Sequence, residues 1–316
     1  MNQKNVIILT GPTAVGKSAL SISLAKALGS GIISADSMQV YKHMNIGTAK
    51  ITREEMQGIP HALIDTYEPE EPFHVVQFVH DAKEAMEQLW SNGQLPLIVG
   101  GTGFYIQALL YDIDFSTEDA DMAYRNSLQL LAKEKGVQAL HEMLAQVDPG
   151  AAKQIHANNV KRVIRALEFY KKTGRPISAH NETEHAKSSP YGFAYFVLTD
   201  RREHLYERID ARVDAMMEQG LLDEVKALKE MGYSRELVSM QGLGYKQLLA
   251  YLDGECSLDE AIYIIKRDTR HFAKRQLTWF RRERDVIWVD KSAFDYDEEK
   301  ILQYLLTEIE KRGLMP

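Results

Sequence analysis

The sequence predicts an α/β fold, in which a parallel sheet is flanked by helices and interrupted by an all-helical insertion. Residues 1–115 alternate short apolar runs with helical patterns, as is typical of a parallel sheet covered on both faces. Between 116 and 191 the strand-like runs vanish and helical patterns dominate. From 192 onwards strand character returns. We therefore expect an α/β core made of residues 1–115 and 192–316, with a helical insertion domain at 116–191.

Individual elements follow from periodicity. Short apolar runs mark strands, and they cover Val6–Thr10, Ile32–Ala35, Ala62–Asp65, Leu95–Val99, Phe193–Thr199 and Val286–Val289. Apolar residues at helical spacing mark helices in the core, over Ser18–Gly29, Val75–Trp90, Arg202–Gln219, Asp223–Met231 and Leu258–Arg282, with one more after Lys291. The insertion is predicted to hold helices over Arg125–Lys135, Val137–Gln146 and Asn159–Thr173, and a short one within Asp148–Ile155.

Composition narrows the protein class. Hydrophobic residues make up 45% of the 316 residues and charged residues 26%, as in ordinary globular proteins. No apolar stretch is long enough to span a membrane, and the N-terminus has no signal-peptide cleavage pattern. Cys256 is the single cysteine, which excludes an internal disulfide framework and a cysteine-rich zinc site. We expect a cytoplasmic protein.

The segment GPTAVGKS (Gly11–Ser18) is a predicted phosphate-binding loop, because it lies between a predicted strand and a predicted helix. Gly11 and Gly16 allow the backbone to turn its N–H groups inward around anionic oxygens. Lys17 adds a full positive charge to the partial charge of the helix N-terminus. Ser18 can offer a hydroxyl to Mg²⁺. The alternative is an ordinary glycine-rich turn; the favoured interpretation is a P-loop NTPase-like sheet.

Two further segments follow predicted strands, at the edge where open α/β sheets place their ligands. Asp36 can act as a general base or bind magnesium; equally, it can cap local N–H groups. The second segment is GGTGFY (Gly100–Tyr105), whose glycines imply a close backbone approach. Its strand supplies no carboxylate of the kind that nucleotide hydrolases use, although Asp65 could fill that role.

Basic residues are concentrated in parts of a chain whose net charge is −7. One cluster lies within 159–176, and a second, interleaved with aromatic residues, lies between Lys266 and Arg284. Each is either a solvated helical face or a nucleic-acid surface, and the two together make a nucleic-acid partner a serious alternative. Arg208 and Arg212 share one helix face. They either close over a phosphate or form helical salt bridges with Glu207 or Asp214.

Several motifs together resemble the tRNA dimethylallyltransferases. They are GPTAVGKS, SADSMQVYKHMNIGTAK, HALID, GGTGFY, KRVIRALE and RHFAKRQLTWFRR, and they occur in the order found in that family. The resemblance runs from about residue 6 to 290. The sequence departs from the family in having Ser18 where threonine is common, and QGLGYKQ where isoleucine or valine often precedes GYK. Serine keeps the magnesium-binding hydroxyl.

The resemblance implies transfer of a dimethylallyl group from dimethylallyl diphosphate to N6 of adenosine 37 in the tRNA anticodon loop, with release of diphosphate. It assigns catalysis to Asp36, Thr13, Thr102 and Arg212. Diphosphate binding falls to Gly11, Pro12, Thr13, Ala14, Val15, Gly16, Lys17, Ser18 and Arg208, with Mg²⁺ on Ser18. Contacts to tRNA fall to Asp36, Ser37, Met38, Gln39, Thr102, Arg125, Lys161, Arg162, Val163, Ile164, Arg165, Lys274 and Arg275. We expect a monomer with no membrane partner.

Two other functions fit the same residues before the resemblance is considered. One is a small-molecule kinase, with Arg208 and Arg212 closing over the phosphate and Asp36 acting as base for a substrate hydroxyl. The other is a non-catalytic, RNA-binding NTPase switch. Salt-dependent binding of tRNA distinguishes the transferase from a metabolite kinase.

Overall fold

The computed structural model describes residues 4–115 and 121–315. Within it the chain forms two compact units, one made of residues 1–110 and 190–316 and the other of residues 111–189. The expected start of the insertion, at residue 116, lies outside the described residues. Each unit is built around its own apolar cluster, and each is described separately below.

The first unit contains a six-stranded parallel sheet in the order β3-β2-β4-β1-β5-β6. Its strands are β1 (Asn5–Thr10), β2 (Ile32–Ser34), β3 (His61–Ala62), β4 (Leu97–Gly100), β5 (Gly192–Thr199) and β6 (Val286–Asp290). The parallel sheet flanked by helices confirms the predicted fold class. Because β1, β4 and β5 lie side by side, the loops after residues 10 and 100 start at the same edge of the sheet.

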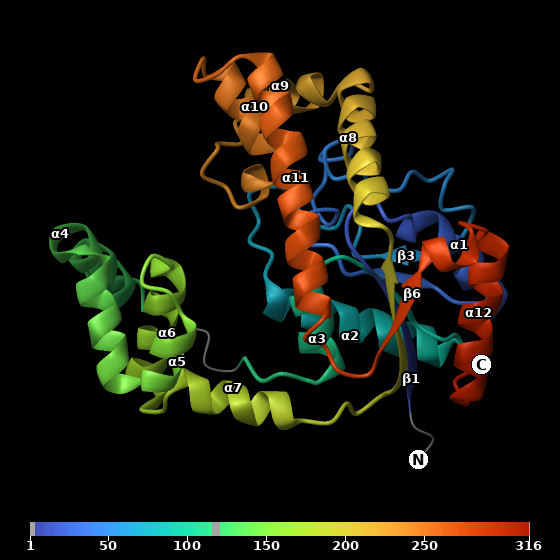
Figure 1. Cartoon of the computed structure of the whole chain (residues 1–316), viewed down its shortest axis with the longest axis horizontal. Helices are drawn as coiled ribbons and strands as arrows, with labels where there is room; N and C mark the ends of the chain where they lie inside the picture. Colours follow the sequence, from blue (N-terminus) through green and yellow to red (C-terminus); the bar gives the residue numbers. More distant parts are fainter. Residues whose placement is uncertain (1–3, 116–120, 316) are drawn as a thin grey trace. The chain divides into compact units, whose positions relative to one another are not determined.

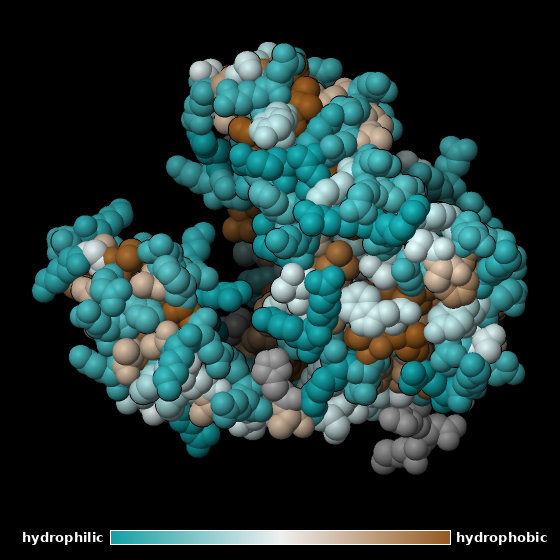
Figure 2. All heavy atoms as spheres, viewed as in Figure 1, coloured by the Kyte–Doolittle hydropathy of each residue, from teal (hydrophilic) through white to brown (hydrophobic). Residues whose placement is uncertain are grey.

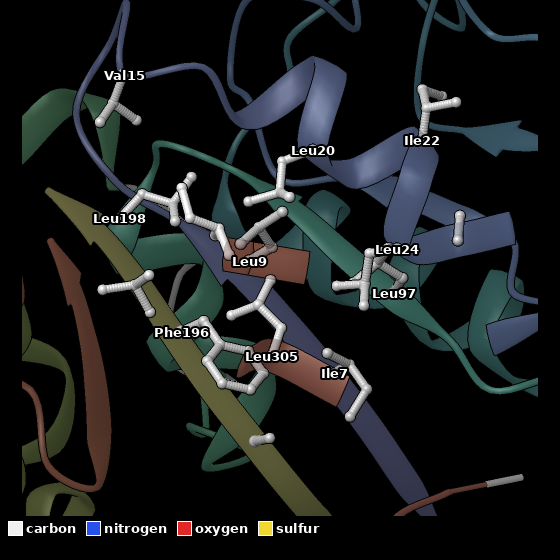
Figure 3. Close-up of a cluster of buried hydrophobic side chains, with 14 of the residues drawn as sticks. Ile7, Leu9, Val15, Leu20, Ile22, Leu24, Leu97, Phe196, Leu198 and Leu305 are labelled. Atoms are coloured by element: carbon white, nitrogen blue, oxygen red, sulfur yellow. The ribbon is translucent and has the colours of Figure 1, made fainter. Parts of the chain in front are cut away.

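The helices of the first unit flank the sheet, and some of them extend away from it (Figure 1). They are α1 (Lys17–Leu28), α2 (Val75–Ser91), α3 (Gly103–Leu110), α8 (Arg202–Glu218), α9 (Leu221–Glu230), α10 (Tyr245–Leu252), α11 (Leu258–Phe280) and α12 (Glu298–Lys311). Helices α1 and α12 contact each other and the sheet. Figure 3 shows Leu20 and Leu24 of α1 and Leu305 of α12 gathered over Leu9 and Phe196.

Apolar patterning and end signals explain these helices. In α12, Ile301, Leu305 and Ile309 recur every four residues and are fully buried. The carboxylate of Asp297 accepts the N–H groups of Glu299 and Lys300 at its start, and Ser257 caps α11 in the same way. Strand β3 is shorter than predicted because Leu63 and Asp65 adopt positive φ angles, which end the extended conformation.

The second unit is all-helical. Its helices are α4 (Met122–Val147), α5 (Pro149–Gln154), α6 (Val160–Thr173) and α7 (Ile177–Ala186), and α4 packs against α5 and α6. The two helices expected on either side of Gly136 are the halves of α4, which Gly136 interrupts with a φ of 83°. Helix α7 was not predicted, because its residues have little apolar periodicity.

The described part of the chain contains no helix that is both long and apolar enough to cross a membrane. On the face drawn in Figure 2, hydrophilic residues predominate and apolar residues show only in small patches.

Candidate active site

The predicted phosphate-binding loop connects β1 to α1 and depends on glycine at position 11. Gly11 has a φ of 147°, and a Cβ atom there would lie 2.6 Å from the carbonyl oxygen of Leu198. Gly16 ends the loop with a φ of 99°, in the left-handed region that favours glycine. The first turn of α1 therefore starts directly at the loop and directs its free N–H groups towards it.

Lys17 is held by the loop itself. Its Nζ donates hydrogen bonds to the carbonyl oxygens of Gly11 at 3.0 Å and Pro12 at 2.9 Å. The pKa of Lys17 is lowered to about 8, chiefly because the group is buried; the negative charge of Asp36 opposes this shift, and the positive charge of Arg212 adds to it. The pKa shift indicates that an anion bound in the loop would stabilise the charged form of Lys17.

Two cavities adjoin at this edge of the sheet. The phosphate cavity, of about 480 Å³, is lined by Gly16, Lys17, Ser18, Arg208 and Arg212, among others. The apolar cavity, of about 320 Å³, has walls that include Met38, Val213, Leu221, Leu243, Tyr245 and Ile265. Residues shared by both are Thr13, Ala14, Asp36, Thr48, Gly101, Arg212, Phe272 and Gln276. An anionic group and an apolar group can therefore occupy neighbouring spaces, with Asp36 beside both.

Asp36 follows β2. One of its carboxylate oxygens caps the backbone N–H groups of the following turn, and the other can still contact a ligand. Its Oδ1 accepts the N–H of Met38 at 2.9 Å and that of Gln39 at 3.4 Å. Within the described residues no hydrogen bond is recorded for Oδ2. Both interpretations of Asp36 made from the sequence are thus compatible with the geometry, because one oxygen orders the turn and the other is left for a ligand.

The second glycine loop packs against the segment that carries Asp36. Thr102 donates its N–H to the carbonyl oxygen of Ala35 at 3.2 Å, and its Oγ1 accepts the N–H of Ser37 at 3.2 Å. Thr13 lines both cavities, and Thr102 lines the apolar cavity. The structure therefore brings Asp36, Thr13, Thr102 and Arg212 to one site, as the resemblance implied.

Gln276 is a site residue that the sequence interpretation missed. It lies on α11, is 6% exposed, and contacts both glycine loops. Its Oε1 accepts the N–H of Thr13 at 2.9 Å, and its Nε2 donates to the carbonyl oxygen of Gly101 at 2.9 Å. One signal was present in the sequence: Gln276 stands four residues from Phe272 and from Phe280, on the core-facing stripe of α11. A polar residue on such a stripe requires partners.

Arg208 and Arg212 face the site from α8. The Nε of Arg208 donates to the carbonyl oxygen of Ala14 at 2.8 Å. Burial lowers the pKa of Arg212, Asp36 raises it, and Arg208 lowers it. The alternative of helical salt bridges is wrong for the described residues, since neither arginine pairs with Glu207 or Asp214, and Asp214 pairs instead with Lys266 of α11 at 2.6 Å. Both guanidinium groups are thus placed to meet an anion.

Asp65 is held away from both cavities. It pairs with the buried ammonium group of Lys50, which also donates to the carbonyl oxygen of Tyr41. Neither cavity is lined by Asp65. The suggestion that Asp65 supplies the carboxylate of a nucleotide hydrolase is therefore wrong.

The donor set at the loop suits Mg²⁺. The exposed side chain of Ser18 lies on the first turn of α1 and lines the phosphate cavity together with Asp36. Mg²⁺ commonly takes one or two protein oxygens and completes its shell with phosphate oxygens and water. Among the described residues, a group of three potential metal ligands from His, Cys, Asp and Glu occurs only at His80, Asp81 and Glu84 on α2, outside these cavities.

The predicted tRNA-contacting residues fall in different environments. In the core unit, Ser37, Met38 and Gln39 line the cavities, and Lys274 and Arg275 are exposed on α11. In the helical unit, Lys161 and Arg162 are exposed and Arg165 is half-buried. Val163 and Ile164 are instead 0% and 4% exposed within the apolar cluster, so their side chains do not belong to the surface.

Arg125 is paired inside the helical unit. Its guanidinium donates twice to the buried carboxylate of Glu168, through Nε at 2.8 Å and Nη2 at 2.9 Å. The pairing raises the pKa of Arg125. Such a bidentate pair holds α4 to α6, which gives Arg125 a structural role whatever else it contacts.

Comparison with known proteins places this site in a family. Residues 39–283 match the family model described as IPP transferase. The tRNA dimethylallyltransferase of Lachnoclostridium phytofermentans is 60% identical over 306 residues, which cover 97% of this chain and 96% of that protein.

Two solved structures are also similar. The tRNA isopentenylpyrophosphate transferase of Bacillus halodurans has a TM-score of 0.74 at 44% identity, and the match covers 98% of each chain. A eukaryotic dimethylallyltransferase acting on tRNA has a TM-score of 0.77 at 31% identity, covering 91% of this chain and 74% of that one. This chain belongs to the IPP transferase family.

Proposed function

We propose that this protein transfers a dimethylallyl group from dimethylallyl diphosphate to N6 of adenosine 37 in the tRNA anticodon loop. Family membership and the names of the similar proteins support a prenyl transfer to tRNA. The single observation that carries the proposal is that one site joins a phosphate cavity, an apolar cavity and the carboxylate of Asp36. A donor with an anionic leaving group and a short apolar chain fits these two spaces.

The diphosphate binds in the loop Gly11–Ser18, where backbone N–H groups and Lys17 face the anion. Arg212 and Arg208 approach from α8 and neutralise the charge that develops as the bond between C1 and the diphosphate oxygen breaks. Ser18 would hold Mg²⁺ in the phosphate cavity, and the ion would supply further neutralising charge there.

The dimethylallyl chain lies in the apolar cavity. The N6 amine of adenine attacks C1, so that a nitrogen–carbon bond forms while diphosphate leaves with the bonding electrons. A purine amine is a weak nucleophile, and the N6 proton passes to the carboxylate of Asp36. The adenosine must leave its stack to reach this enclosed site, and Ser37, Met38 and Gln39 line the path beside it.

The helical unit supplies further contacts to tRNA through exposed cations such as Lys161 and Arg162. A basic helix that reads shape and phosphate positions suits A-form RNA. We further propose that the enzyme acts as a monomer in the cytoplasm, where its tRNA substrate is found.

The test is transfer of a labelled dimethylallyl group from dimethylallyl diphosphate to unmodified tRNA by the full-length protein with Mg²⁺. We expect label in tRNA at adenosine 37 and release of diphosphate in equal amounts. ATP turnover without any transfer would instead support the kinase or the NTPase switch.

A further inference from the structure

Helix α11 has an exposed face and a buried face near the site. Lys274 and Arg275 are exposed, whereas the next residue, Gln276, is buried, and both the oxygen and the nitrogen of its amide group have a backbone partner. Basic residues earlier on the same helix bind it to α8, through Arg270–Asp210 and Lys266–Asp214. The helix that bears Gln276 is therefore held to α8 by two ion pairs.

The hydrogen bonds of Gln276 join two loops that are otherwise separate in the sequence. Thr13 belongs to the phosphate loop, and Gly101 immediately precedes Thr102. Thr102 in turn accepts the N–H of Ser37, next to Asp36. One amide thus connects the loop that holds the leaving group with the segment that holds the base.

The partners dictate the orientation of this amide. The backbone of Thr13 can only donate through its N–H, and Gly101 offers its carbonyl oxygen, so Oε1 must face Thr13 and Nε2 must face Gly101. The lack of a side chain at Gly101 leaves room for the amide group of Gln276, since a Cβ atom at that position would collide with Nε2 of Gln276. No other side chain of similar length carries both a donor and an acceptor in this arrangement without first taking up a proton.

We infer that Gln276 is a positioning residue, which sets the distance between the bound diphosphate and the carboxylate of Asp36 by clamping the two glycine loops. The inference rests on the proposed transfer. Misplacement of reacting groups by about 1 Å can lower turnover about a hundredfold. Loss of the clamp should therefore reduce kcat more than substrate binding.

The first test replaces Gln276 by methionine, which has similar length but neither hydrogen bond. We expect Gln276→Met to lower kcat by about tenfold to a hundredfold, with the KM for tRNA within about threefold of the unchanged protein. The matched control is Gln303→Met on α12, where the glutamine is exposed and its side chain donates a hydrogen bond to the side chain of Glu299. A folded Gln276→Met protein with unchanged kcat would overturn the inference.

The second test keeps the shape and makes the clamp depend on pH. In Gln276→Glu, a protonated carboxyl group can donate to Gly101 and accept from Thr13, whereas the ionised form has no donor for Gly101. We expect kcat of this variant, relative to the unchanged protein at each pH, to rise at least about threefold from pH 8 to pH 6. A purely structural defect would leave that ratio flat, and a flat ratio contradicts the clamp.

These outcomes separate the two proposals. If the unchanged protein transfers no dimethylallyl group to tRNA, the proposed function fails, whatever the variants do. If the unchanged protein is active and both variants match it, only the role of Gln276 is overturned.

Discussion

The hydroxyl of Tyr245 donates a hydrogen bond to Oε1 of Glu224 at 2.7 Å. Burial, and after it the negative charge of Glu224, raises the pKa of Tyr245, so the hydroxyl keeps its proton. The same carboxylate accepts the backbone N–H groups of Asn45 and Ile46 at 2.8 Å and of Gly47 at 3.1 Å. Glu224 of α9 therefore fixes a loop that forms one wall of the apolar cavity.

Replacing Glu224 by glutamine should loosen this wall. Both oxygens of the carboxylate accept hydrogen bonds, so an amide would turn its NH₂ group towards a donor. We expect Glu224→Gln to lower the free energy of unfolding by about 2 kcal/mol and to raise the KM for the prenyl donor, measured by chemical denaturation and steady-state kinetics. The control is Asp223→Asn on the same helix, where the side chain is 81% exposed and pairs only with Lys226 among the described residues. Equal effects of the two substitutions would contradict this role of Glu224.

The depressed pKa of Lys17 predicts how binding of the donor depends on pH. Lys17 holds a diphosphate best when charged, and burial lowers its pKa to about 8. Relative to the Kd of Lys17→Met at the same pH, which cancels the ionisation of the ligand itself, the Kd for inorganic diphosphate should therefore be constant below pH 7 and rise above pH 8, approaching about tenfold per pH unit. Calorimetric titration of both proteins between pH 6 and 9.5 measures this ratio, and Lys17→Met should bind weakly throughout. A rise of the same steepness in Lys17→Met would assign the effect to another group.

The lowered pKa of Lys17 also makes the stability of the folded protein depend on pH. The unfolded chain regains the ordinary pKa of 10.5, so between about pH 8 and 10.5 the unfolded state holds more protons on Lys17 than the folded state. This group alone makes the free energy of unfolding of the ligand-free protein rise with pH across that window. Between pH 8 and pH 10, the free energy of unfolding should change more favourably for the unchanged protein than for Lys17→Met. Chemical denaturation of both proteins at the two pH values measures this difference.

Asparagine at position 36 isolates the charge of Asp36 from its structural role. Asp36→Asn keeps an Oδ1 that can accept the N–H of Met38, so the turn after β2 is preserved. We expect turnover to fall by about a hundredfold to ten-thousandfold, while the Kd for tRNA changes less than about threefold. Asp36→Ala should lose the turn as well and weaken tRNA binding further. An Asn variant with more than a tenth of normal turnover would show that Asp36 is not the base.

The sequence was sufficient to predict the sheet and the strand–loop–helix arrangement around Gly11–Ser18, because these depend on local patterns. Apolar runs marked each strand, and the spacing of Gly11, Gly16 and Lys17 marked the loop. The helical spacing of apolar residues also contradicts one assignment made from the resemblance. Val160, Val163, Ile164 and Leu167 follow this spacing, which predicts that Val163 and Ile164 are buried and do not contact tRNA.

The clamps at the site could not be predicted in this way. Gln276 contacts backbone atoms that are 263 and 175 residues distant in the chain, and Glu224 contacts a loop that is 177 to 179 residues away. Backbone groups carry no residue-specific signal, so neither side chain has a recognisable partner in the sequence. Helix α10 was missed for a related reason: it has only eight residues and follows two glycines.

Within the helical unit, substitutions should separate residues that hold the fold from residues that contact tRNA. Lys161 and Arg162 are exposed, so Lys161→Gln and Arg162→Gln should each reduce the salt dependence of tRNA binding by about one unit of the log–log slope. Backbone hydrogen exchange in α4 and α6 should be the same in these two variants as in the unchanged protein. An unchanged slope in both variants would exclude these two side chains from the tRNA surface.

Arg125→Met should behave in the opposite way. It removes both hydrogen bonds from Glu168, which is 7% exposed, and leaves a buried carboxylate without its partner. We expect a local destabilisation of about 2 kcal/mol, seen as faster hydrogen exchange in α4 and α6. If Arg125→Met instead weakens tRNA binding with normal protection of both helices, Arg125 acts directly on the RNA.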